Sequence, residues 1–160
     1  MRSAEDEVFI EKLLSSTFNG DIRMASTFPL ELVTPERLLF SEEVQSIRAP
    51  GVTGSFGILA NHAPLLTELA TGLIKLTLPN GNEAFIATSG GFLEVSNNKV
   101  TILADSAQLS DEIDVEKAKA AAERARKLLE LPDDGSLDAE ALRKELEHAQ
   151  NLIKVAQLKS

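Results

Sequence analysis

Two histidines are the side chains of this sequence best suited to acid–base chemistry near neutral pH. They are far apart: His62 follows a glycine-rich stretch and His148 lies near the C-terminus. The sequence holds no G-x-S-x-G elbow, no G-x-x-x-x-G-K-[ST] phosphate loop, no G-x-G-x-x-G fingerprint and no His/Asp/Glu cluster at metal-ligand spacing. We therefore expect no catalytic residues and no metal site, and a small hydrolase using His62 is the least favoured interpretation.

The stretch before His62 has glycines at every third position, Gly51, Gly54 and Gly57, and continues into Asn61-His62-Ala63-Pro64. Closely spaced glycines permit positive φ and close backbone approach, while Pro64 fixes its own φ and favours extended geometry before it. We predict a rigid, shaped loop between strands over 51–72, with a cluster of β-turns over a capped core as the alternative. In that loop His62 is expected to hydrogen-bond the backbone or to meet a partner.

The composition excludes several function classes. The 160 residues carry a formal net charge of −9, and their 4% aromatic content is all Phe. An acidic chain without Trp or Tyr is poorly suited to nucleic acid or to an anionic lipid surface. Apolar runs stay well short of the ~18 residues of a membrane span. We expect no nucleic-acid partner and no direct lipid insertion.

The chain divides into three parts. Residues 1–24 are interpreted as an N-terminal extension, either native or produced by a misplaced start upstream of Met24, with a short amphipathic helix as the alternative. Residues 25–107 alternate apolar and polar side chains at a period near two, and turn signals such as Asn80-Gly81 separate the short runs. This pattern predicts an antiparallel β-sandwich or flattened barrel.

The period changes to that of a helix in residues 108–160. Apolar residues recur on one face from Ile113 onward, Ser110 and Asp111 are candidate N-caps, and the stretch 131–136 ends the first helix. A second helix over 137–158 follows a short connection, which predicts an antiparallel helical hairpin. The predicted fold class is thus α+β in two parts, and the thin apolar stripe requires the hairpin to lean on the sandwich or on a partner.

Three ordered motifs carry a family resemblance. The runs GSFGILANHAPLL, TSGGFLEV and VTILAD start at Gly54, Thr88 and Val100. Together they resemble the epsilon subunit of rotary F-type ATP synthases, over roughly residue 27 to the C-terminus. One departure is Ala60, where the family often has Pro.

The resemblance implies a non-catalytic rotor subunit of the central stalk of a proton-translocating ATP synthase. Its implied partners are the gamma shaft subunit, the c subunits of the membrane ring, and the alpha and beta subunits of the catalytic head. The implied location is peripheral, on the cytoplasmic face of the bacterial plasma membrane. The hairpin is expected to inhibit ATP hydrolysis when it extends into the head. A free-standing ATP-sensing or adaptor module without a rotary partner remains the alternative.

The family pattern also suggests partner-binding residues. The glycine-flanked tip that contacts the membrane ring falls on Ser55, Phe56 and His62, although Phe56 is equally consistent with a buried core residue. Candidate contacts to acidic surfaces of the head are Arg143, Lys144 and Lys154.

A nucleotide-sensing motif of the family, Ile/Leu-Asp-x-x-Arg-Ala, is similar to residues 113–118. The candidate ATP-site residues are Ile113, Asp114, Lys117, Ala118 and Arg124. Lys117 replaces the family's Arg, and the basic positions of the second helix fall on His148 and Leu152. Because a charged amphipathic helix explains the same pattern, we expect no bound cofactor and at most weak ATP binding.

Overall fold

The structure is a computed structural model of the chain, and it describes residues 26–158. The interpretation of residues 1–24 lies outside this range. The strands are β1 (Phe28–Val33), β2 (Leu38–Val44), β3 (Ser46–Gly51), β4 (Gly54–Leu59), β5 (Leu65–Leu69), β6 (Gly72–Thr77), β7 (Glu83–Thr88), β8 (Gly91–Ser96), β9 (Lys99–Ala104) and β10 (Ala107–Leu109). A 3-10 turn, η1 (Ser110–Glu112), leads to helices α2 (Val115–Leu129) and α3 (Ala139–Ala156).

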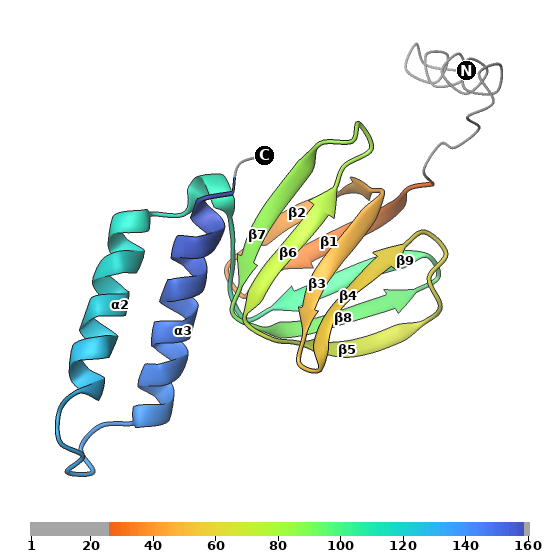
Figure 1. The fold of residues 1–160 in the computed structure, drawn as a ribbon. Helices are drawn as coiled ribbons and strands as arrows, with labels where there is room; N and C mark the ends of the chain where they lie inside the picture. The colour runs from red at the N-terminus through yellow and green to blue at the C-terminus, as the bar shows by residue number, and fades with distance from the viewer. Residues whose placement is uncertain (1–25, 159–160) are drawn as a thin grey trace.

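The strands form one strongly bent sheet that folds over itself as a sandwich (Figure 1). Its order is β10-β7-β6-β3-β5-β8-β9-β1-β2, with β4 added to β3 as a hairpin. The predicted fold class, a β-sandwich followed by a helical hairpin, is confirmed. One pairing departs from the antiparallel prediction, because β1 and β9 run parallel.

The core lies between the two layers and is built from the apolar phase of each strand. In β8, Gly91, Leu93 and Val95 are buried while the residues between them are exposed. This period of two is what the sequence predicts, since successive side chains of a strand point to opposite faces. The largest fully buried side chains come from both layers: Phe28, Leu30, Leu32, Val44, Ile47, Ile58, Ile74, Leu76, Ile86, Leu93, Val100 and Ile102.

The stretch 51–72 is not the single loop that the glycines suggest. It contains strands β4 and β5, joined to each other at Asn61 and His62. Gly51 and Gly54 face each other across the tight β3–β4 turn, and Ile58 of β4 points into the core. The glycines hid the alternation of apolar and polar side chains that marks a strand. Glycine has no side chain, so the three glycines of this stretch contribute nothing to such a pattern.

The expected boundary at residue 107 falls on the first residue of β10. This short strand pairs with β7 through Ala107 and Thr88, and Ala107 belongs to the sandwich core. The sandwich as the structure describes it therefore continues through Leu109.

Gly91 opens β8 where this strand lies very close to its neighbouring strand β9, opposite Ala104. Its φ is +136°, and a Cβ at this position would lie 2.1 Å from the Leu103 carbonyl oxygen and 2.8 Å from the Ala104 Cα. Both the dihedral angle and the space require glycine. The predicted break at Gly90-Gly91 is thus a close approach between the backbones of the neighbouring strands β8 and β9.

The two helices pack along a face of small residues. Ala118, Ala122 and Ala125 are buried on α2, as are Leu142 and Ala149 on α3. Ser110 and Asp111, the predicted N-caps, form η1 instead. Because β10 extends the sheet to Leu109, the helix starts later, and Asp114 caps it by accepting a hydrogen bond from the Lys117 backbone N–H at 3.1 Å.

Only one end of the hairpin joins the sandwich, and its tip points away from the sheet (Figure 1). Five buried residues make the junction, and we name them the docking cluster: Phe85, Ala87, Ile113, Val155 and Ala156. The Asn151 side chain adds hydrogen bonds from Nδ2 to the carbonyl oxygens of Gly72 at 2.9 Å and Thr88 at 3.4 Å. The helical hairpin has only a thin apolar stripe and is expected to lean on another surface, and the sandwich provides that surface.

Replacing Gly91 by Ala tests the close approach between β8 and β9. Gly54→Ala is the matched control, because Gly54 has the same φ of +136° but a Cβ at that position would meet nothing within 4 Å. We expect Gly91→Ala to lower the free energy of unfolding by about 2 kcal/mol more than Gly54→Ala, since only Gly91 adds a steric clash to the backbone strain. Urea unfolding of both variants measures the difference, and equal losses would show that the space between β8 and β9 tolerates a methyl group.

Candidate functional site

The outer face of the layer that contains β5, β8 and β9 carries exposed apolar side chains. Leu66 is 69% exposed, Phe92 52%, Leu103 57% and Leu38 56%. Phe92 pairs with Leu103, Leu103 with Val33, and Val33 with Leu38, so an apolar row crosses four neighbouring strands. We call Leu38, Leu66, Phe92 and Leu103 the outer apolar patch.

Sequence reasoning missed this patch. The signal was present, because each of its β8 and β9 members occupies the polar phase of an alternating strand: Phe92 adjoins buried Leu93, and Leu103 adjoins buried Ile102. A contiguous apolar surface on a folded domain marks a contact surface for another protein. Only the strand order, however, brings residues that are distant in sequence into one patch.

The β3–β4 hairpin holds two of the predicted ring contacts. Ser55 is exposed beside the turn, and exposed Val52 occupies the turn itself. Phe56 is half-buried and packs against the sandwich core. Ser55 is thus accessible to a partner, whereas Phe56 mainly anchors the β3–β4 hairpin to the sandwich core.

His62 lies apart from Ser55, at the β4–β5 corner. Its Nδ1 donates a hydrogen bond to the Ala63 carbonyl oxygen at 2.7 Å, and its backbone N–H donates to the Leu59 carbonyl at 3.3 Å. Asn61 has a φ of +62° and donates its N–H to the Asn98 side chain at 2.6 Å. His62 therefore stabilises the β4–β5 corner, which Asn98 links to the β8–β9 turn. Among the described residues, the geometry gives His62 no catalytic partner.

A groove of about 480 Å³ runs between α2 and α3 above η1. Three of the five candidate ATP-site residues, Asp114, Lys117 and Ala118, line it. The other lining residues are Gln108, Glu112, Ala121, Glu145, His148, Ala149 and Leu152. A groove of this size is within the range of small-molecule pockets.

The remaining two candidates lie outside the groove. Ile113 is buried in the docking cluster. Arg124 lies farther along α2, where its guanidinium is 3.9 Å from the Glu145 carboxylate. Ile113 thus holds the hairpin on the sandwich, and Arg124 pairs across the two helices.

The charges of the groove are mainly negative. Glu112, Asp114 and Glu145 line it with one cation, Lys117. Burial lowers the pKa of His148 below its usual value, so the imidazole is neutral at pH 7, and its Nδ1 is buried with no hydrogen-bond partner in the described chain. Asp114 is engaged as the N-cap of α2. This arrangement is unfavourable for a polyphosphate.

The three basic residues predicted to meet the catalytic head are exposed on α3. Lys144 lies 3.6 Å from Glu140, one turn earlier. Arg143 lines a small depression at the hairpin tip, and Lys154 lies in the last turn of α3. They spread along the helix and do not form one patch.

Metal-ligand clusters and membrane-spanning helices are two further features that would bear on function. Within residues 26–158, no group of three or more His, Cys, Asp or Glu side chains could hold a metal ion. No helix of this described part is both long and apolar enough to span a bilayer.

Comparison with known proteins assigns the chain to a family. The model of the family described as "ATP synthase, Delta/Epsilon chain, beta-sandwich domain" matches residues 27–110. An ATP synthase epsilon chain of Desulforamulus reducens is 44% identical over 135 residues, which are 84% of this chain and 100% of the relative. One from Desulfitobacterium hafniense is 51% identical over 106 residues, covering 66% of this chain and 80% of the relative.

Solved structures show the same fold. A chain of the Euglena gracilis mitochondrial ATP synthase, in a structure of its OSCP/F1/c-ring, is 27% identical with a TM-score of 0.69, over 81% of each chain. A chain from the central stalk and c-ring of the Tetrahymena thermophila enzyme has a TM-score of 0.51 at 14% identity, which concerns the fold alone. The sandwich, the two helices that follow it and the identity to relatives over 66% to 84% of this chain agree: this chain belongs to the epsilon-chain family of ATP synthases.

Proposed function

We propose that this chain is a non-catalytic rotor subunit of a proton-translocating ATP synthase, which couples the gamma shaft to the c ring and inhibits ATP hydrolysis through its helices. It would act peripherally, on the cytoplasmic face of the bacterial plasma membrane. The outer apolar patch is the observation that carries the proposal, because it requires a protein partner. Family membership identifies the assembly in which that partner is found.

The outer apolar patch is the proposed docking surface for the gamma shaft. The patch extends over β5, β8, β9, β1 and β2, and these strands form a continuous and rigid part of the sheet. A rigid surface loses little conformational entropy on binding, which suits a permanent contact that must transmit torque. Phe92 is the central residue of the patch and the one aromatic side chain in it.

The β3–β4 hairpin is the proposed contact for the c ring. Ser55 and Val52 are exposed at its end, and half-buried Phe56 fixes it to the core. β3 of this β-hairpin neighbours β5 through the pair Gly51 and Leu69, but exposed Ser55 and Val52 lie outside the outer apolar patch. The sandwich can therefore contact shaft and ring with different surfaces.

The helical hairpin is the proposed inhibitory element, acting on the alpha and beta subunits of the head. Its attachment to the sandwich is less extensive than the packing between the two helices, and it consists of the docking cluster with the partly buried residues Leu73, Val115, Leu152 and Leu158 against it. The basic residues Arg143, Lys144 and Lys154 are exposed on α3 and are available to acidic surfaces of the head. A weakly attached hairpin with its own helix–helix packing can change position without unfolding.

Regulation by bound ATP is not part of the proposal. The groove between the helices has the shape of a ligand site, but three carboxylates face one lysine in it. We propose that contact with the head, and not nucleotide, sets the position of the hairpin.

Substituting the central residue of the outer apolar patch tests the shaft contact. We expect Phe92→Asp to weaken binding to the gamma subunit by about 30-fold, the effect of losing a hot-spot residue of about 2 kcal/mol. Leu59→Asp is the control, because Leu59 is 67% exposed on β4, outside the patch. Binding of each variant to purified gamma subunit is measured by titration, and equal affinities for the two variants would contradict the assignment.

Removing the hairpin tests its inhibitory role. A chain that ends at Glu112 keeps β10 and η1, so its sandwich should remain folded and should assemble with shaft and ring. We expect ATP hydrolysis by the assembled complex to rise about fivefold or more, the range of ordinary allosteric coupling. A chain ending at Ala104 loses the β10–β7 pairing and should unfold more easily. An unchanged hydrolysis rate with intact assembly would remove inhibition from the proposed function.

Calorimetric titration with ATP tests the groove. We expect a dissociation constant near millimolar, because each missing charge-assisted phosphate contact costs about ten- to a hundred-fold in affinity. Glu145→Arg converts a groove carboxylate into a cation and should tighten binding about tenfold, whereas Glu147→Arg, on the same helix outside the groove, should not. A low micromolar constant for the unmodified chain would show that the groove is a working nucleotide site.

A further inference from the structure

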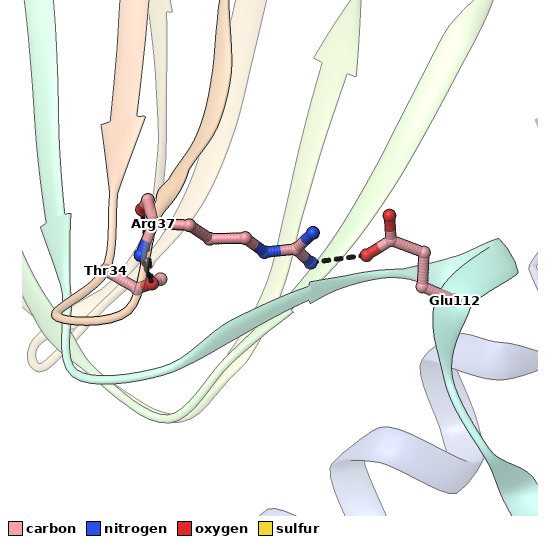
Figure 2. A network of polar contacts seen from close by, with 3 residues as sticks. All are labelled: Thr34, Arg37 and Glu112. Atoms are coloured by element: carbon pink, nitrogen blue, oxygen red, sulfur yellow. Dashed lines mark hydrogen bonds and ion pairs between the residues drawn. The ribbon is translucent and has the colours of Figure 1, made fainter.

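One ion pair joins the sandwich to the connection that leads into the hairpin (Figure 2). The Arg37 guanidinium, from the turn between β1 and β2, reaches across to η1 and donates from Nη2 to Glu112 Oε2 at 2.5 Å. The two residues are 75 positions apart in the sequence. The pair is thus a tertiary contact at the junction of the two parts.

The turn that carries Arg37 is braced from within. The Thr34 hydroxyl accepts a hydrogen bond from the Arg37 backbone N–H at 3.2 Å, and it lies 3.3 Å from the Arg37 carbonyl oxygen, to which it donates. The Thr34 backbone N–H donates to the same carbonyl at 2.9 Å, and Thr34 is buried. A fixed backbone means that less conformational entropy is lost when the side chain of Arg37 forms the pair.

Glu112 lies in the connection about which the helical hairpin would have to rotate in order to leave the sandwich. It ends η1, the next residue is Ile113 of the docking cluster, and α2 begins at Val115. Movement of the hairpin away from the sandwich takes Ile113 out of that cluster. Such movement changes the backbone next to Glu112, and we expect it to draw the carboxylate away from Arg37, whose turn stays with the sandwich.

We propose that the Arg37–Glu112 pair is an electrostatic latch that favours the docked position of the hairpin, with Thr34 as its positioning residue. The inference rests on the proposed function only in assuming that the hairpin can leave the sandwich. The latch adds a polar contact to the docking cluster and to the hydrogen bonds of Asn151.

The expected strength of the latch is modest. Side chains of Arg37 and Glu112 are 50% and 43% exposed, so water and salt screen their attraction. Exposed pairs of this kind shift an equilibrium by about two- to fivefold. A latch of this strength biases the position of the hairpin and still allows it to open.

The absence of cysteine from the sequence makes opening measurable in the full-length chain. Ala156→Cys places a single thiol in the docking cluster, and its reaction rate with a thiol reagent reports how often the cluster opens. Ala49→Cys places a thiol in the sandwich core, where labelling requires unfolding of the sandwich itself. The ratio of the two rates separates hairpin opening from global unfolding.

Arg37→Ala in the Ala156→Cys background should speed labelling about two- to fivefold at low salt, and this gain should shrink at high salt. The reversed pair, Arg37→Glu with Glu112→Arg, should return labelling close to its original rate. Thr34→Val should give part of the Arg37→Ala effect. Lys99→Ala is the matched control, because it breaks a pair to Glu31 of similar exposure, 47% and 41%, that lies wholly within the sandwich.

The outcomes separate the latch from the function on which it rests. Faster labelling in Arg37→Ala, with rescue by the reversed pair and no effect of Lys99→Ala, supports the latch. If Ala156→Cys reacts faster than Ala49→Cys but Arg37→Ala leaves its rate unchanged, the latch is wrong and the mobile hairpin stands. If both thiols react at the same rate in every variant, the hairpin leaves only on global unfolding, and both proposals fail.

Discussion

The apolar contact between α3 and β7 is the interaction on which the arrangement of the sandwich and the helical hairpin depends. Phe85 and Ala87 of the sheet pack with Val155 and Ala156 of the helix. Ile113, from the connection between the two parts, belongs to the same cluster. Burying surface of this limited size stabilises the docked hairpin without making it inseparable, because hydrophobic stabilisation is roughly proportional to buried apolar area. The helix-to-helix packing is more extensive, so the hairpin holds together as a unit whichever way it faces.

The sandwich is stabilised differently, by a core that both layers share. Within its sheet, Gly91 of β8 lies so close to the neighbouring strand β9 that a Cβ would have no room beside Leu103. Because this core fills the space between the layers, apolar side chains on the outer face add nothing to it. Their exposure at Phe92 and Leu103 makes this face a candidate contact surface for another protein. In the proposed function, one rigid domain presents separate surfaces to a shaft and to a ring.

Electrostatics decides what the groove between the helices can bind. The motif at 113–118 has the order expected for a nucleotide-sensing helix, and Asp114, Lys117 and Ala118 do line the groove. In this chain, however, Glu112 and Glu145 line it too, His148 is neutral through burial, and Asp114 already caps α2. Two of these carboxylates also pair with arginines, Glu112 with Arg37 and Glu145 with Arg124, which leaves Lys117 as the one lining cation that a polyanion would meet. Weak binding of ATP therefore stays a prediction for this groove.

The sequence by itself determined the two-part fold and the family. Period-two alternation, the change to helical spacing and three ordered motifs are local signals, and local signals can be read along a chain. It did not determine β4 and β5, because glycines removed the alternating side chains that mark a strand. Only the tertiary structure decided which distant residues meet: the outer apolar patch depends on strand order, and the Arg37–Glu112 pair depends on how the connection crosses the β1–β2 turn. Contacts between residues this far apart are set by the packing of whole elements, which a linear pattern does not contain.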